Sequence, residues 1–203
     1  MLNAKKLTTE ETLQTITLKA PYLLFVGSET EPIYAKTAAG LAHWVPEKCM
    51  GQLSLPGGTI DLGLPKHDVV SAAKAGAKSL VIGTSAVGGA IPAAWMPTLI
   101  QALESGLDIV AGVHTKLNDM PELVAAAKES GASLVDVRVP PKDIPVGTGL
   151  KRTGKRLLTV GTDCALGKKY TALAIARAMQ ERGIDADFRA SGQTGIMIAG
   201  NGI

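Results

Sequence analysis

Residues 157–177 read LLTVGTDCALGKKYTALAIAR, and this stretch decides the fold of the second half of the chain. An apolar run from Leu157 to Val160 leads into a turn bounded by Gly161 and Gly167, and Lys168 and a helical pattern follow at once. A strand, a glycine loop, a lysine and a helix, in this order, are typical of a phosphate-binding loop, in which backbone N–H groups surround an anion. We therefore predict that Lys168 contacts a phosphate or a similar oxyanion. The alternative is a glycine-rich strand-to-helix turn without a ligand.

The loop departs from the usual pattern G-x-x-x-x-G-K-[ST] at two points. Five residues separate the two glycines, and Lys169 stands where a serine or threonine would hold Mg²⁺. Thr171 follows two residues later, about 200° around the helix, so it does not replace that ligand. We therefore predict anion binding and assign no metal ligand. The residues predicted to surround the phosphate are Gly161, Thr162, Asp163, Cys164, Ala165, Leu166, Gly167, Lys168, Lys169 and Thr171.

The first 139 residues alternate between short apolar runs and segments of helical period. We expect strands over residues 22–26, 49–55, 79–82, 107–113 and 134–139, and helices over 37–44, 68–75, 93–104 and 120–130. Strands that alternate with helices form βαβ units, and continuous apolar runs indicate strands that are covered on both faces. The prediction is an α/β fold with a doubly wound, mainly parallel sheet of Rossmann-like type.

A connection rich in proline and glycine, residues 140–156, separates this unit from the phosphate-binding loop. We therefore predict a Rossmann-like N-terminal domain over residues 1–150 and a P-loop α/β domain over residues 151–203. After the loop helix we expect a strand over residues 184–190 and a turn over 191–195. One βαβ unit cannot cover a sheet on two faces, so we expect the second domain to continue beyond residue 203.

Three further residues are candidates for a site at the carboxyl edge of the sheet. His114 follows the fourth expected strand, where open α/β sheets bind ligands, and an imidazole that titrates near neutrality suits a general base. A hydrogen-bonded loop histidine is the alternative. Arg189 and Gln193 follow the strand after the loop helix and are candidates for substrate binding in the same cleft. Lys168 and His114 are the two catalytic candidates.

The composition limits the classes of partner that we expect this protein to bind. The 203 residues carry a formal charge of +3, with 46% hydrophobic and 3% aromatic residues, and no run of lysine and arginine interleaved with aromatics that would indicate nucleic-acid binding. No stretch approaches the ~20 apolar residues that span a bilayer. Two cysteines far apart in the sequence suit a reducing cytoplasm. We expect a cytoplasmic homo-oligomer that acts on a small molecule, without a nucleic acid or membrane partner.

The segment GTDCALGKKYTA, residues 161–172, resembles the P-loop of the bacterial and archaeal D-glutamate N-acetyltransferase family, formerly a family of unknown function. Supporting segments between residues 80 and 203 are VIGTSAVGG, GLDIVAGVHTKLNDMPEL, DVRVPP and RASGQTGIMIAGNGI. The resemblance implies a Rossmann-like domain followed by a P-loop domain, acetyl-CoA as donor and an acidic D-amino acid such as D-glutamate as acceptor. It also implies that the P-loop binds a phosphate of CoA, and Arg189 is a candidate to hold the acceptor carboxylates.

Two other functions remain open at this stage. The loop is also similar to that of dethiobiotin synthetase, GTD-x-x-x-GKT, which implies an ATP-dependent kinase or ligase with Mg²⁺, although Lys169 departs from that pattern. In this case Lys168 would stabilise the transferring phosphoryl group. The third function is a nucleotide-binding module without catalysis, in which the loop controls a partner contact.

Overall fold

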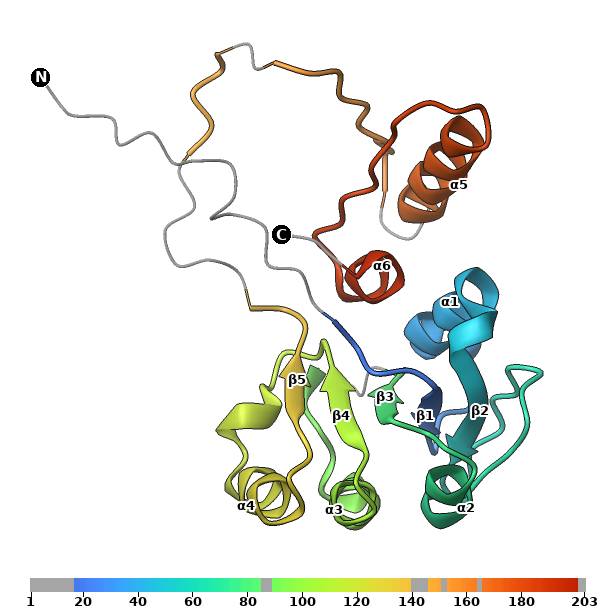
Figure 1. The fold of residues 1–203 in the computed structure, drawn as a ribbon, viewed down its shortest axis with the longest axis vertical. Helices are drawn as coiled ribbons and strands as arrows, with labels where there is room; N and C mark the ends of the chain where they lie inside the picture. The colour runs from blue at the N-terminus through green and yellow to red at the C-terminus, as the bar shows by residue number, and fades with distance from the viewer. Residues whose placement is uncertain (1–16, 85–88, 140–145, 151–152, 164–165, 201–203) are drawn as a thin grey trace, which may run out of the picture.

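The computed structural model describes residues 17–84, 89–139, 146–150, 153–163 and 166–200. Its centre is a five-stranded, all-parallel sheet with the order β2-β1-β3-β4-β5 (Figure 1). The strands are β1 (Tyr22–Gly27), β2 (Cys49–Ser54), β3 (Ser79–Ile82), β4 (Asp108–Ala111) and β5 (Leu134–Asp136). The register places Leu80 beside Leu23 on one side and Ile109 on the other. The predicted α/β fold with a parallel sheet is confirmed.

Helices cover both faces of this sheet. The helices of the described structure are α1 (Lys36–Trp44), α2 (Val69–Lys74), α3 (Met96–Glu104), α4 (Pro121–Ser130), α5 (Lys168–Gln180) and α6 (Gln193–Ala199), with short 3₁₀ turns at Pro32–Tyr34, Pro46–Lys48, Ala93–Trp95 and Leu117–Asp119. Figure 1 shows α2, α3 and α4 along one face and α1 and α6 along the other. Successive side chains of a strand point to opposite faces, so Leu23 and Phe25 enter the first core and Leu24 and Val26 the second.

The predicted elements of the first unit agree with the observed ones to within three residues at each end. Local signals explain the helix ends. The Asp68 carboxylate accepts a hydrogen bond from the Ser71 N–H at 2.7 Å and so caps the start of α2. Gly131 follows α4 in the left-handed conformation, with φ of 74°, which glycine adopts at little cost.

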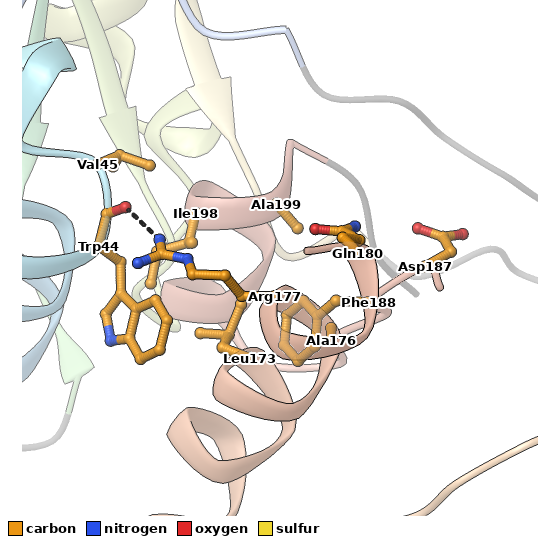
Figure 2. A pocket seen from close by; sticks show the side chains of 10 residues that line it. All are labelled: Trp44, Val45, Leu173, Ala176, Arg177, Gln180, Asp187, Phe188, Ile198 and Ala199. Atoms are coloured by element: carbon orange, nitrogen blue, oxygen red, sulfur yellow. Dashed lines mark hydrogen bonds between the residues drawn. The ribbon is translucent and has the colours of Figure 1, made fainter. Parts of the chain in front are cut away.

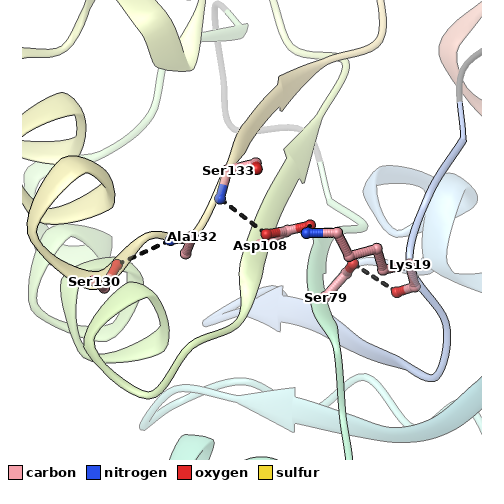
Figure 3. Close-up of polar contacts among 6 residues, drawn as sticks. All are labelled: Lys19, Ser79, Asp108, Ser130, Ala132 and Ser133. Carbon is pink, nitrogen blue, oxygen red and sulfur yellow. Dashed lines mark hydrogen bonds and ion pairs between the residues drawn. The ribbon is translucent and has the colours of Figure 1, made fainter.

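A buried carboxylate links the segment before β1 to the amino ends of β4 and β5 (Figure 3). Asp108, at the start of β4, is 4% exposed, and its carboxylate lies 2.8 Å from the Lys19 ammonium and accepts a hydrogen bond from the Ser133 N–H at 2.8 Å. The Ser79 hydroxyl donates to the Lys19 carbonyl at 2.7 Å. The amino ends of β3, β4 and β5 and the segment before β1 are therefore joined by polar contacts.

The second unit differs from the prediction at both of its expected strands. Residues 157–160 form no strand, and Leu158 and Val160 are 83% and 77% exposed. Residues 184–190 are likewise extended without a ladder, except for a single bridge residue at Ala190. A parallel strand needs a neighbouring strand to accept its hydrogen bonds. The described part of the chain offers these two segments no such neighbour, and this is why the two strand predictions are wrong.

The turn predicted over residues 191–195 is also wrong in its second half, because Gln193 begins α6. This helix buries Ile196 and Met197 in the core that α1 forms with the sheet. On this face of the sheet α6 lies beside α1 (Figure 1). The second unit is therefore packed directly onto the first sheet.

The connection between the units is exposed wherever it is described, at residues 146–150 and 153–156. The exact domain boundary at residue 150 stays a prediction. Cys164, Ala165 and the remaining parts of the expected turns and connection lie outside the described residues. In the part of the chain that the structure describes, no helix combines the length and the apolarity needed to cross a bilayer.

Candidate functional site

The amino end of α5 is formed as the glycine loop predicts. Gly167 precedes the helix with a left-handed φ of 89°, and Lys168 is the first helical residue. The Lys168 side chain folds back over the loop, where its ammonium donates to the Asp163 carbonyl and its Cδ atom lies 3.3 Å from where a Cβ atom of Gly161 would be. The first turn of α5 contains no acidic residue. The first-turn N–H groups of α5, the helix dipole and a lysine therefore face the loop together, as an anion site requires.

The next two residues join this helix to the first unit. Tyr170 stacks on Trp44 of α1, with ring centroids 6.0 Å apart and an interplanar angle of 6°, and its hydroxyl donates to the Lys36 carbonyl at 3.4 Å. The Lys169 ammonium lies 4.3 Å from the centre of the Tyr170 ring. Burial, and secondly the positive charge of Lys36, lower the pKa of Lys169 below its usual value. The amino ends of α1 and α5 therefore lie side by side, and each contributes a lysine.

The amino end of α6 reaches the same region. The hydroxyls of Thr194 in α6 and Thr37 in α1 share a buried hydrogen bond of 2.8 Å. A Cβ atom at Gly40 would lie 2.7 Å from the Tyr170 hydroxyl oxygen and 2.8 Å from the Thr194 methyl carbon. Only a glycine at this position lets the three helices approach so closely. The amino ends of α1, α5 and α6 thus converge beside the sheet.

This convergence lies at the carboxyl edge of the sheet, where the strand order places β2 and β3 on opposite sides of β1. Open α/β sheets bind ligands at such a switch in strand order. Ala38 in the first turn of α1 donates its N–H to the Gly83 carbonyl at 2.9 Å, directly after β3. Gly112, directly after β4, packs closely against Gln193. A Cβ atom at Gly112 would lie only 2.4 Å from the Gln193 side-chain oxygen.

Two polar atoms at this edge are buried without a hydrogen-bond partner in the described structure: the Gln193 side-chain oxygen and the Thr84 hydroxyl oxygen. A buried acceptor without a partner costs about 1–3 kcal/mol. Thr84 was not singled out by the sequence, because a threonine after a buried strand is a common residue there. Gln193 lies beside Gly112 at the carboxyl end of β4, and its role in substrate binding stays a prediction.

The remaining predicted residues are more dispersed. His114 is exposed after β4, where its N–H donates to the Gly89 carbonyl at 3.0 Å and its ring packs against Gly89. The Arg189 guanidinium is exposed and paired with Asp187, with its Nε donating at 2.6 Å. Thr171 is exposed on the outer side of α5. The structure thus places Lys168 and Lys169 at the start of α5 and Gln193 at the start of α6, and the roles of these residues, of His114 and of Arg189 stay predictions.

A pocket of about 240 Å³ lies at the other end of α5, between that helix, the carboxyl end of α1 and the carboxyl end of α6 (Figure 2). Arg177 crosses its mouth, with its guanidinium carbon 4.8 Å from the centre of the Trp44 ring and its Nη2 donating to the Trp44 carbonyl at 3.4 Å. Leu173 and Phe188 supply apolar walls. Sequence reasoning missed this pocket because its lining comes from segments more than 120 residues apart. The lining residues of α5, Leu173 to Gln180, lie about 8–18 Å from Lys168 along the helix.

Comparison with known proteins places the same two units in one family. A family model described as "Domain of unknown function (DUF1611_N) Rossmann-like domain" matches residues 54–140, and one described as "Domain of unknown function (DUF1611_C) P-loop domain" matches residues 145–203. The two models meet within the proline- and glycine-rich connection.

Two curated relatives and one solved structure are similar over most of this chain. A D-glutamate N-acetyltransferase of Tritonibacter scottomollicae is 50% identical and one of a Pseudoalteromonas species is 46% identical, each over 186 residues, which are 92% of this chain and 56% of the relative. The crystal structure of a DUF1611 family protein from Anabaena variabilis is 31% identical, with a TM-score of 0.77 over 91% of this chain and 57% of that one. The chain therefore spans little more than half the length of these relatives.

Proposed function

The chain belongs to the DUF1611 family, and from this membership we propose that the full-length protein is an N-acetyltransferase that acts on an acidic D-amino acid such as D-glutamate. The observation that carries the proposal is the similarity, over 92% of this chain, to two proteins of that name. Lysines gather at the starts of α1 and α5, and the first turns of α1, α5 and α6 contain no acidic residue. This positive charge supports the proposal that both substrates are anionic.

In the proposed reaction, acetyl-CoA is the donor. The neutral amino nitrogen of the acceptor attacks the thioester carbonyl carbon, a C–N bond forms, the C–S bond breaks and the CoA thiolate leaves. The amine proton passes to a base, and the thiolate takes up a proton from that base or from water. His114 is the proposed base because its imidazole is exposed at the carboxyl end of β4, on the edge that the helix ends share.

The phosphate-binding loop holds a phosphate of the donor in this proposal. Lys168 supplies a full positive charge beside the free N–H groups of α5, and each charge-assisted hydrogen bond of this kind contributes about 1.5–3 kcal/mol. The adenine and phosphate groups of CoA carry no part of the chemistry at the thioester. Their binding energy serves to place the thioester against the acceptor.

A P-loop of the usual form carries Mg²⁺ on the hydroxyl that follows its lysine, and the residues here do not fit that ion. The side chain at this position is the ammonium-bearing Lys169, which cannot ligate a cation, and Thr171 faces outward. Among the described residues, no three His, Cys, Asp or Glu side chains gather as metal ligands would. No step of the proposed reaction uses a metal.

The test is a turnover measurement on the full-length protein. Incubated with acetyl-CoA and D-glutamate, it should release CoA thiol and yield a product heavier than glutamate by one acetyl group, as mass spectrometry reports. L-Glutamate and D-alanine test the preference for configuration and for the second carboxylate. Hydrolysis of ATP that depends on the amino acid, with no release of CoA, would instead support a kinase or ligase.

A further inference from the structure

The amino ends of α1 and α5, which adjoin each other, each carry a lysine. Lys36 is the first residue of α1, and its carbonyl accepts the Tyr170 hydroxyl at 3.4 Å. Lys169 is the second residue of α5, and its ammonium lies 4.3 Å from the centre of the same Tyr170 ring. Tyr170 therefore contacts the backbone of Lys36 and the side chain of Lys169.

Among the described residues, no carboxylate lies within ion-pair distance of either of these two lysines. In the part of the chain that the structure describes, neither Lys36 nor Lys169 forms an ion pair. Lys169 is half-buried, and its Cδ atom lies 3.5 Å from where a Cβ atom of Gly195 would be, at the first turn of α6. Two like charges held together, one of them partly removed from water, are unfavourable unless an anion joins them.

Lys169 occupies the loop position that usually provides a ligand of Mg²⁺. In other P-loops the residue directly after the lysine provides the oxygen ligand of Mg²⁺, and the ion in turn neutralises phosphate oxygens. Here that position carries the ammonium of Lys169, and the charge of Lys36, the first residue of α1, is the second cause that lowers the pKa of Lys169. Both charges repel a divalent cation and attract the oxyanion that the cation would have neutralised.

We propose that Lys36 and Lys169 form an oxyanion subsite in the place of the P-loop magnesium ion, so that the anionic substrate binds at this junction without a metal. The inference rests on the proposed function for the identity of the ligand, which is a phosphate of CoA or a carboxylate of the acidic acceptor. Both present the same chemistry to an ammonium group, namely charged oxygens that accept short hydrogen bonds.

The test is calorimetric titration of CoA, and separately of D-glutamate, into the full-length protein with EDTA or with excess Mg²⁺. The wild-type affinity for both ligands should be the same in the two conditions. Lys169→Ala should weaken one of them at least about tenfold in both conditions, since one charge-assisted hydrogen bond is worth that factor or more. Lys169→Thr should weaken the same ligand with EDTA and recover with Mg²⁺, because it restores the usual hydroxyl.

Two further variants complete the experiment. Lys36→Gln should weaken the same ligand as Lys169→Ala, and it remains informative if changes at Lys169 prevent folding, because Lys36 is exposed. Lys128→Ala is the matched control: it removes an exposed lysine from α4, on the opposite face of the sheet, and should change neither affinity. The ligand that loses affinity identifies the source of the oxyanion, phosphate or carboxylate.

Three results would overturn the proposal. They are a wild-type affinity that needs Mg²⁺, Lys169→Ala and Lys36→Gln affinities equal to those of the wild type, and a Lys169→Thr variant that does not respond to Mg²⁺. If neither CoA nor D-glutamate binds the wild type, the proposed function fails, and titration with inorganic phosphate then tests the subsite alone. Phosphate affinity should fall about tenfold in Lys169→Ala, and an unchanged value would contradict the subsite.

Discussion

The aromatic stack of Trp44 on Tyr170 is expected to hold the phosphate-binding helix on the first unit. The two rings are parallel, with centroids 6.0 Å apart, and the Arg177 guanidinium covers Trp44 at 4.8 Å. An aromatic pair contributes about 0.5–1.5 kcal/mol beyond its buried area, and a cation over an aromatic ring at an exposed site contributes about 0.5–1 kcal/mol. Because Trp44 is only half-buried, Trp44→Ala should lower the free energy of unfolding by ~2–4 kcal/mol.

A double-mutant cycle isolates the stack from the loss of burial. Trp44→Ala, Tyr170→Ala and the double variant should show a coupling energy of ~0.5–1.5 kcal/mol in urea unfolding of the full-length protein. Tyr170→Phe is the matched control, because it keeps the ring and removes only the hydroxyl, whose hydrogen bond to Lys36 is long at 3.4 Å. That variant should lie within about 0.5 kcal/mol of the wild type. Additive effects of Trp44→Ala and Tyr170→Ala would refute the reasoning.

Three further predictions concern buried polar groups. Thr84→Val should leave the free energy of unfolding unchanged or raise it, because the lost hydroxyl has no partner in the described structure. Thr194→Val breaks a buried 2.8 Å hydrogen bond and should lower the free energy of unfolding by ~1–3 kcal/mol. Equal losses for the two variants in urea unfolding would contradict this difference. Lys19→Ala leaves the Asp108 carboxylate buried with one fewer partner and should lower the free energy of unfolding by ~1–2 kcal/mol. If the loss is no larger than that of replacing an exposed lysine without a partner, the ion pair does not stabilise the fold. Burial, and then the charge of a nearby glutamate, raise the pKa of Cys49 to about 12, so only about one thiol in ten thousand is ionised at pH 8. Iodoacetamide should therefore label Cys49 rapidly only after unfolding, as peptide mass spectrometry would report, and rapid labelling of the folded protein would be inconsistent with this pKa.

The sequence predicts the first unit well because its signals are local. Five apolar runs become five strands, and Asp68 and Gly131 mark helix ends by their own backbone preferences. Helix α5 begins at Lys168, as the glycine loop indicates. Each of these features depends on residues within a few positions of one another.

The features that the sequence does not predict depend on distant partners. Whether the apolar run 157–160 becomes a strand depends on a neighbouring strand, which the run itself cannot encode. The stack of Trp44 on Tyr170 and the hydrogen bond between Thr37 and Thr194 join residues more than 120 positions apart. The sequence around Gly40 does not indicate its role either, because the residues that approach it closely, Tyr170 and Thr194, belong to the second unit.

The phosphate-binding role of Lys168 is the central claim, and one titration tests it most directly. CoA is titrated into the full-length wild type and Lys168→Ala, with Lys128→Ala as the control for loss of a lysine. The account predicts an affinity at least about tenfold weaker in Lys168→Ala, because one charge-assisted hydrogen bond is lost, and an unfolding curve close to that of the wild type, because the ammonium contacts the loop and not the core. An unchanged affinity for CoA in Lys168→Ala would contradict it and leave the segment from Gly161 to Gly167 as a structural turn.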